Sequence, residues 1–231
     1  MFSLKPSLLI AGLGLLSVPG LSLLDRTAPA VDTDAVDYEV TVTNITRGQI
    51  LSPVIVVSHT GDQTPIFQLG QAASNELAMV AEDAINQPLI DMLNASAEVN
   101  DVQVLNGAGG PLMPGETAKI VVQGDPGRFN QLSLVSMLVV TNDAFAGLSG
   151  VDLPRRGSVD YRAAAYDAGS EANNEMCAFI PGPPCNNPMI RQTTGAEGYV
   201  HVHAGIHGIG DLDESQYDWR GDVAAVSIRR M

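Results

Sequence analysis

Two short acidic stretches carry residue types that could bind a metal ion. Asp167 and Glu171 stand four positions apart in "YDAGSE", and Asn142 and Asp143 follow the apolar run "LSLVSMLVV". Both stretches are expected at strand ends, where the loops of a β-sandwich gather. If the two loops lie side by side, their three carboxylates would repel one another unless a hard cation neutralised them. Ca²⁺ suits such a site because it takes roughly six to eight oxygen ligands in irregular geometry. The alternative is that both loops are simply solvated.

A second group of possible ligands lies in "GYVHVHAGIHG". His201 and His203 would share one face of a strand, and His207 follows after a turn. This set could chelate zinc or copper, with Asp211 as a further ligand, and so serve a metalloenzyme. The alternative is that these imidazoles form hydrogen bonds with loop carbonyls. The sequence contains no G-x-S-x-G elbow, phosphate-binding glycine loop or H-E-x-x-H motif, so our first expectation is a protein that is not an enzyme.

The elements that must position these residues are mainly β-strands. Period-two or continuous apolar patterns predict strands over 38–46, 51–61, 101–107, 117–124, 131–143, 158–169, 198–206 and 223–231. A helical insertion is expected near residues 72–96, with Ser74 as its N-cap and Pro88 dividing it. Short strands separated by turns predict an antiparallel β-sandwich. No long linker divides residues 38–231, so we expect one domain there.

The first thirty residues differ from the rest. Lys5 precedes an apolar run, and the small residues Ala28 and Ala30 follow it, which is typical of a secretory signal over residues 1–30. Residues 31–37 would then be an acidic spacer, and no integral membrane span would remain after cleavage. Export to a periplasm or the cell exterior would place Cys177 and Cys185 in an oxidising compartment, where we expect them to form a disulfide.

The overall charge of the chain argues against one class of partner, nucleic acids. The chain has a formal net charge of −14 and 12 Lys and Arg residues among 231. Nucleic-acid binding requires clustered basic residues, so a nucleic-acid partner is not expected. The acidity itself is also explained by solubility and mutual repulsion between copies.

Four segments, in order, resemble the spondin domain, the amino-terminal module of F-spondin and mindin. "SPVIVVSHTGD" is similar to the family's S-P-x-x-x-x-S-H-S, and "ASNELAMVAEDA" to its A-S-x-x-L-x-x-x-A-E. "LVSMLVVTNDAFAGLSGVDL" resembles S-M-I-V-P-S-P-D-W-F-V-G-V-D-S-L, and "YDAGSE" resembles Y-D-A-G-T-D. The resemblance extends from about Tyr38 to Arg230.

This resemblance implies a secreted, adhesive β-sandwich with one calcium ion. The matching positions would supply Asp143, the carbonyl of Ala144, Asp167 and Glu171 as ligands. The sequence departs from the family where S-P-D-W becomes T-N-D-A, and where Glu171 replaces an aspartate. A further family acid has only Gln123 or Asp125 near its place. The implied function is an extracellular binding or adhesion module for a protein or glycan ligand, and a purely structural cell-surface protein is the alternative.

Overall fold

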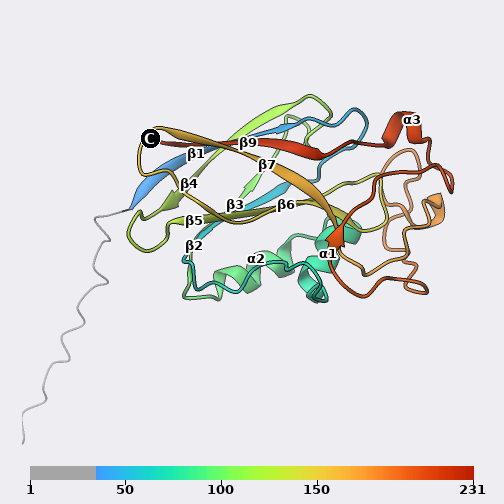
Figure 1. Cartoon of the computed structure of the whole chain (residues 1–231), viewed down its shortest axis with the longest axis horizontal. Helices are drawn as coiled ribbons and strands as arrows, with labels where there is room; N and C mark the ends of the chain where they lie inside the picture. Colours follow the sequence, from blue (N-terminus) through green and yellow to red (C-terminus); the bar gives the residue numbers. More distant parts are fainter. Residues whose placement is uncertain (1–34) are drawn as a thin grey trace, which may run out of the picture. The chain divides into compact units, whose positions relative to one another are not determined.

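The strands of this protein form one continuous antiparallel sheet that is nearly closed into a barrel (Figure 1). The computed structural model describes residues 35–231. Its main strands are β1 (Val36–Asn44), β2 (Val54–His59), β3 (Val99–Leu105), β4 (Thr117–Gly124), β5 (Gln131–Met137), β6 (Ala144–Asp152), β7 (Ser158–Asp167) and β9 (Asp222–Arg230). Hydrogen bonds join them in the order β3-β2-β5-β6-β7-β9-β1-β4, and the short β8 (His201–Val202) pairs with β7. The prediction of a mainly β, antiparallel protein is confirmed.

The two edge strands, β3 and β4, meet through side chains. The backbone N–H of Gln123 donates to Oδ2 of Asp101 at 2.8 Å, and the side-chain amide of Asn100 donates to the Gln123 carbonyl at 3.0 Å. Within residues 35–231 no backbone ladder joins these edges. The barrel is therefore nearly closed, and its seam is held by polar side chains.

The strand β6 explains why the sheet is continuous where two separate sheets were expected. The sequence pattern predicted a single strand over 131–143, but β5 ends at Met137, and the chain turns and returns as β6. Without β6, strands β3-β2-β5 and β7-β9-β1-β4 would be the two sheets of a sandwich; β6 pairs with both β5 and β7 and joins them. Its sequence, "AFAGLSGVD", is rich in Ala and Gly, so it lacks the β-branched signal of a strand.

Two hydrophobic clusters occupy the two faces of the sheet. The larger cluster packs the inner faces of strands from opposite sides of the sheet, including Val40, Val56, Leu134 and Val226. The second cluster lies between the outer face of β2, β5 and β6 and the helices α1 (Asn75–Asp83) and α2 (Gln87–Asn94), which cover that face (Figure 1). Every residue of β2 is buried, as its continuous apolar run predicted.

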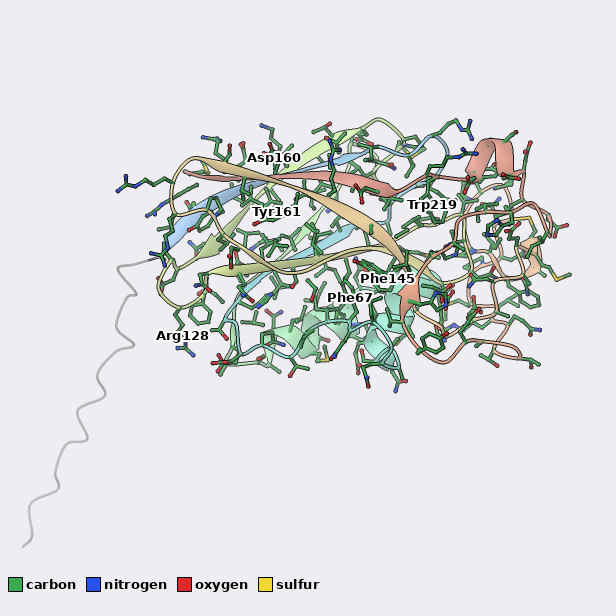
Figure 2. All side chains as sticks on the ribbon, in the orientation of Figure 1. Phe67, Arg128, Phe145, Asp160, Tyr161 and Trp219 are labelled. Carbon is green, nitrogen blue, oxygen red and sulfur yellow. A yellow bond between two sulfur atoms is a disulfide. The ribbon has the colours of Figure 1, made fainter. Side chains whose placement is uncertain are left out.

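The helical insertion is confirmed. Ser74 is the N-cap of α1, and its hydroxyl accepts a hydrogen bond from the Leu77 N–H at 3.1 Å. Pro88 lies in the first turn of α2, where its missing N–H costs little. Phe67 joins this layer to the sheet because its ring packs edge-on against that of Phe145, with centroids 5.1 Å apart (Figure 2).

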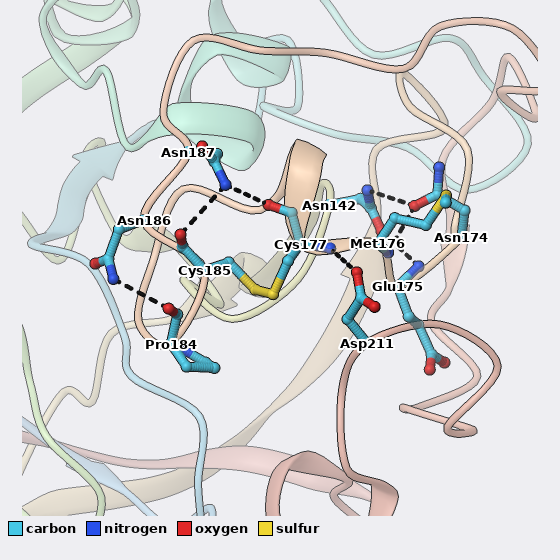
Figure 3. The surroundings of a disulfide bond; sticks show 10 residues. All are labelled: Asn142, Asn174, Glu175, Met176, Cys177, Pro184, Cys185, Asn186, Asn187 and Asp211. Carbon is cyan, nitrogen blue, oxygen red and sulfur yellow. Dashed lines mark hydrogen bonds between the residues drawn. A yellow bond between two sulfur atoms is a disulfide. The ribbon is translucent and has the colours of Figure 1, made fainter.

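The segment between β7 and β9 is mostly irregular and gathers at one end of the sheet (Figure 1). It carries β8, the turn η1 (Cys177–Phe179) and the helix α3 (Glu214–Tyr217). The predicted strand over 198–206 is reduced to β8. Cys177 and Cys185 form the predicted disulfide, and the Asn187 amide donates to both of their carbonyls, at 2.8 and 3.2 Å (Figure 3). The disulfide indicates an oxidising compartment.

The predicted signal over residues 1–30 lies outside the described residues. Of the predicted spacer over 31–37, Val36 and Asp37 belong to β1, where they pair with Gly124 and Gln123. None of the helices in residues 35–231 is long and apolar enough to cross a bilayer.

Candidate metal centre

The turn between β5 and β6 brings Asp143 beside the end of β7. Thr141 shapes this turn, because its hydroxyl donates to the Leu138 carbonyl at 2.6 Å and accepts from the Ala144 N–H at 3.1 Å. Ala144 then pairs with Asp167 in the ladder between β6 and β7. Asp143 and Asp167 are therefore neighbours at the same end of the sheet, although 23 residues lie between them in the sequence.

Asp143 is fully buried, and only one of its carboxylate oxygens has hydrogen-bond partners. Oδ2 accepts from the N–H groups of Ser170 and Glu171 at 2.7 and 2.9 Å, and from the Ser170 hydroxyl at 3.2 Å. Oδ1 has no partner among the described residues. A buried polar atom without a partner typically costs about 1–3 kcal/mol.

Asp167 is also fully buried, and both of its oxygens are bound to the loop that follows it. Oδ1 accepts from the Gly169 N–H at 2.6 Å, and Oδ2 accepts from the side-chain amide of Asn173. Gly169 has φ +67°, and a Cβ at this position would lie 2.4 Å from the carbonyl oxygen of Tyr199. The loop can close over Asp167 only because residue 169 is a glycine.

Glu171 completes the group of acids that the sequence predicted. It is 1 % exposed, and its Oε1 accepts from the Gln192 N–H at 2.7 Å. The nearby cation, Arg191, is paired elsewhere: it contacts Glu82 and lies 3.0 Å from Oδ2 of Asp83. The structure thus brings Asp143, Asp167 and Glu171 to one end of the sheet, and among the described residues no Lys or Arg is paired with any of the three. The basic side chains beside them are His201 and His203, whose Nε2 atoms lie 3.7 and 3.9 Å from the Asp167 carboxylate.

Burial raises the pKa of all three acids. Desolvation, with a further contribution from the charge of Asp167, raises the pKa of Asp143 to about 7. Desolvation is also the largest cause for Glu171, and with the charges of Glu82 and Asp143 it raises the pKa to about 8 despite the bond from Gln192. The pKa of Asp167 is raised by desolvation, against the opposing hydrogen bonds from Asn173 and Gly169. Ionising these groups together is unfavourable unless a cation accompanies them.

Glu175, which follows Glu171 in the loop after β7, has a different role. Its carboxylate accepts from the N–H groups of His207 and Ile209 at 2.6 and 2.9 Å. Its backbone N–H donates to Oδ1 of Asn142 at 3.3 Å, beside the disulfide (Figure 3). Glu175 therefore joins the loop after β7 to the turn around His207.

Strand β8 brings His201 to Asp167, its partner in the ladder with β7. Nε2 of His201 lies 3.7 Å from Oδ1 of Asp167. Asp167, Glu197 and His201 form a group whose ligand atoms all lie within 4.8 Å of one another, and neither Asp143 nor Glu171 belongs to it. The two predicted sites, one of acids and one of histidines, therefore meet at Asp167.

His203 also lies near Asp167, with its Nε2 3.9 Å from Oδ2, but its ring bonds to other groups. Nδ1 of His203 accepts from the Gly205 N–H at 3.0 Å, and its Nε2 lies 3.1 Å from Oδ1 of Asn173. Both ring nitrogens are thus occupied, and burial lowers the pKa of His203 to about 4. His207 is exposed and lines, with His201 and His203, a cavity of about 270 Å³ beside the acids.

No family model matches this chain, and no curated protein matches it in sequence. The resemblance to the spondin domain stays a prediction that rests on the four quoted segments.

Two of the predicted ligand positions are engaged in other contacts. The Ala144 carbonyl, expected to face a cation, accepts a hydrogen bond from the Leu138 N–H at 2.8 Å. Asp125 lies near the beginning of β5, where its N–H donates to the Phe129 carbonyl at 3.0 Å, whereas Asp143 follows the end of that strand. Neither Asp125 nor its neighbour Gln123 joins the acids around Asp167.

Sequence reasoning missed Asn173 and Glu197. Asn173 donates to the carboxylates of both Asp167 and Glu197, the latter at 3.3 Å. Glu197 stands four residues before His201. In a turn that leads into a strand, this spacing does not predict that the two side chains lie close together. The acidic and amide-rich composition of "SEANNE" was the only signal for Asn173.

Proposed function

We propose that this chain is an exported, calcium-binding module that presents the loops at one end of its barrel to an extracellular protein or glycan. Calcium would be held by Asp143, Asp167 and Glu171, and water would complete its ligand shell. The ion would order the loop between β7 and β8 and would perform no chemistry.

The observation that carries this proposal is the unpartnered Oδ1 of Asp143. This atom is buried, it belongs to a group of carboxylates, and the nearby Arg191 is bound to other acids. A divalent cation would give Oδ1 a partner and offset the cost of ionising its neighbours. The acids around Asp143 offer only oxygen, which is the ligand that Ca²⁺ prefers, and calcium tolerates the irregular geometry of two loops.

The surface around these loops favours binding over a purely structural role. Several large apolar side chains in the segment after β7 are at least two-fifths exposed: Met176, Met189, Ile190, Tyr199, Val202 and Ile209. Exposed apolar side chains gathered near one site are a common feature of recognition surfaces. A partner that binds this end of the barrel would bury them.

The finer description of the fold is part of the same proposal. The inner cluster packs β1 and β9 against β2 and β5, as the two layers of a sandwich do. We infer that the continuous sheet is a spondin-type sandwich whose halves are joined by β6. The four segments that resemble the family support this, and the disulfide is consistent with an exported protein.

Thermal unfolding of the purified protein with Ca²⁺ or with a chelator tests the calcium site. Ca²⁺ at 100 times its dissociation constant should stabilise the folded state by about 2.7 kcal/mol. For a domain of this size, that corresponds to a rise in Tm of roughly 5–10 °C. Asp143→Asn should abolish the rise, whereas Asp160→Asn, which changes an exposed acid on β7, should keep it.

An equal Tm in Ca²⁺ and in chelator for the wild type would disprove the calcium site. A rise that Asp143→Asn retains would place the ion elsewhere. If the site is confirmed but no protein or glycan binds in a partner screen, the structural alternative would replace the binding module.

A further inference from the structure

The group Asp167, Glu197 and His201 differs from the calcium site in its chemistry. It combines two carboxylates with one imidazole, and all of its ligand atoms lie within 4.8 Å of one another. In tetrahedral zinc sites with bonds of about 2.0–2.2 Å, neighbouring ligand atoms lie roughly 3.3–3.6 Å apart. The 3.7 Å between Nε2 of His201 and Oδ1 of Asp167 is therefore close to the spacing that a bound ion requires.

The hydrogen bond of the His201 ring selects the tautomer that a metal needs. Nδ1 lies 3.1 Å from the Val202 carbonyl oxygen, and a carbonyl can only accept, so Nδ1 carries the proton of the neutral ring. The lone pair is then on Nε2, the atom nearest to Asp167. Metal-binding histidines are usually oriented in this way, with the other ring nitrogen donating to a carbonyl or carboxylate.

Asn173 positions both carboxylates of the group. Its amide nitrogen donates to Oδ2 of Asp167 and to Oε1 of Glu197, while its carbonyl accepts from Nε2 of His203. The amide uses Oδ2 of Asp167 and Oε1 of Glu197, so Oε2 of Glu197 remains available to an ion. Oδ1 of Asp167 accepts from the Gly169 N–H and keeps a second lone pair for the ion. His203 acts here through Asn173 and offers no free lone pair of its own.

From this geometry we infer a transition-metal site of the zinc class at Asp167, Glu197 and His201, separate from the calcium site except for the shared Asp167. Zinc accepts mixed nitrogen and oxygen ligands, whereas calcium selects oxygen, so the imidazole decides between the ions. Three protein ligands leave at least one position of a tetrahedral ion to water. Glu197 and His201 line the cavity of about 270 Å³, which would admit that water.

Competition for Zn²⁺ between the purified protein and a chromophoric chelator, in buffer that contains Ca²⁺, tests this inference. The wild type should bind one equivalent. Glu197→Gln and His201→Gln should each weaken binding at least tenfold, and Asn173→Ala should weaken it about 10–100-fold, as loss of an orienting partner does. Glu214→Gln and His207→Asn, which change exposed side chains, should retain wild-type affinity.

Co²⁺ provides a second readout, because the intensity of its visible absorption is high in a tetrahedral protein site and low in an octahedral, water-rich one. His201→Gln should lose the absorption that His207→Asn keeps. Zn²⁺ affinities of Glu197→Gln and His201→Gln within twofold of the wild type would overturn the inference, as would failure of the wild type to bind Zn²⁺. A site that depends on His207 would return the assignment to the three-histidine alternative.

The calcium site and the zinc site can be tested independently of each other. Asp143→Asn should lose the calcium-dependent rise in Tm and keep Zn²⁺ binding, and Glu197→Gln should do the reverse. Glu197 is exposed, so its substitution is not expected to prevent folding, and the calcium-dependent melt of the same variant checks this.

Discussion

The backbone N–H of Glu171 donates a hydrogen bond of 2.9 Å to Oδ2 of Asp143, which stands 28 positions earlier in the chain. This bond, with two more from Ser170, fastens the loop after β7 to the turn before β6. The carboxylate of Asp143 is therefore both an anchor for a loop and a candidate ligand. The two roles use different oxygens, because the anchoring bonds all go to Oδ2 and leave Oδ1 without a partner.

Two substitutions of Asp143 separate its roles. Asp143→Ala removes the acceptor of three hydrogen bonds and should lower the free energy of unfolding by roughly 2–4 kcal/mol. Asp143→Asn keeps an acceptor and removes a buried charge, so in chelator at pH 8 it should be at least as stable as the wild type. Urea unfolding of both variants measures the difference, and equal losses in the two would contradict it.

The metal-free protein should lose stability as pH rises from about 6.5 to 8. The folded-state pKa values of Asp143 and Glu171, about 7 and about 8, exceed the ordinary values of 3.8 and 4.5, so the folded state binds more protons. The stability that these two carboxyls contribute is fully present below their ordinary pKa values, and it is lost as pH rises through their pKa values in the folded state. Across this window we expect a fall of roughly 2 kcal/mol, measured by urea unfolding in chelator.

The titration of His203 sets the lower end of the pH range in which this fall can be measured. Its pKa is lowered from 6.5 to about 4, so its contribution is present above 6.5 and is lost as pH falls toward 4, opposite to the carboxyls. Above pH 6.5 the carboxyls act alone. Saturating Ca²⁺ should flatten the profile, because a bound ion keeps its ligands ionised; a metal-free profile that is already flat would count against the buried acids.

Gly169→Ala should disrupt the loop over Asp167. The added Cβ would lie 2.4 Å from the Tyr199 carbonyl oxygen, and φ is +67°. Gly157→Ala is a matched control, because its φ of +65° is similar and nothing lies within 4 Å of its Cβ. We expect the control to lose about 1 kcal/mol and Gly169→Ala clearly more, with loss of metal binding. Equal losses in the two variants would show that the contact with Tyr199 is unimportant.

Removing the disulfide should lower stability and leave the fold intact. Cys177 and Cys185 are 8 positions apart, and closure of so short a loop contributes roughly 2–3 kcal/mol in the chain-entropy model. The double variant Cys177→Ser/Cys185→Ser should show this loss in urea unfolding. After reduction of its disulfide, the wild type should have the same stability as the double variant. Unfolding of the double variant at room temperature would mean that the loop is required for folding.

The predictions that succeeded came from local patterns. Strand β2 could be predicted from its continuous apolar run, and the helical insertion from the Ser74 cap and Pro88. Each of these signals is contained in a few neighbouring residues. The disulfide was predicted from two cysteines and an expected export signal. By contrast, four of the nine residues of β6 are Ala or Gly, whose strand propensity is low, and its pairing on both sides with β5 and β7 makes it a strand.

The candidate site was likewise predicted only in part. Asp143, Asp167 and Glu171 could be named from the sequence because acids cluster at predicted strand ends. Their burial could not, since exposure depends on how the loop after β7 folds back. Glu197 gave no signal and Asn173 only a compositional one, because their contacts with Asp167 cross an irregular loop.

The sequence by itself predicted that the chain is mainly β, with a short helical insertion, a disulfide between its two cysteines and carboxylates at strand ends. Tertiary structure alone decided that β6 joins the sheet into a near-barrel and that Asp167 meets His201 and Glu197. The reason is that side-chain periodicity is encoded in neighbouring residues, whereas the meeting of distant loops depends on which strands pair.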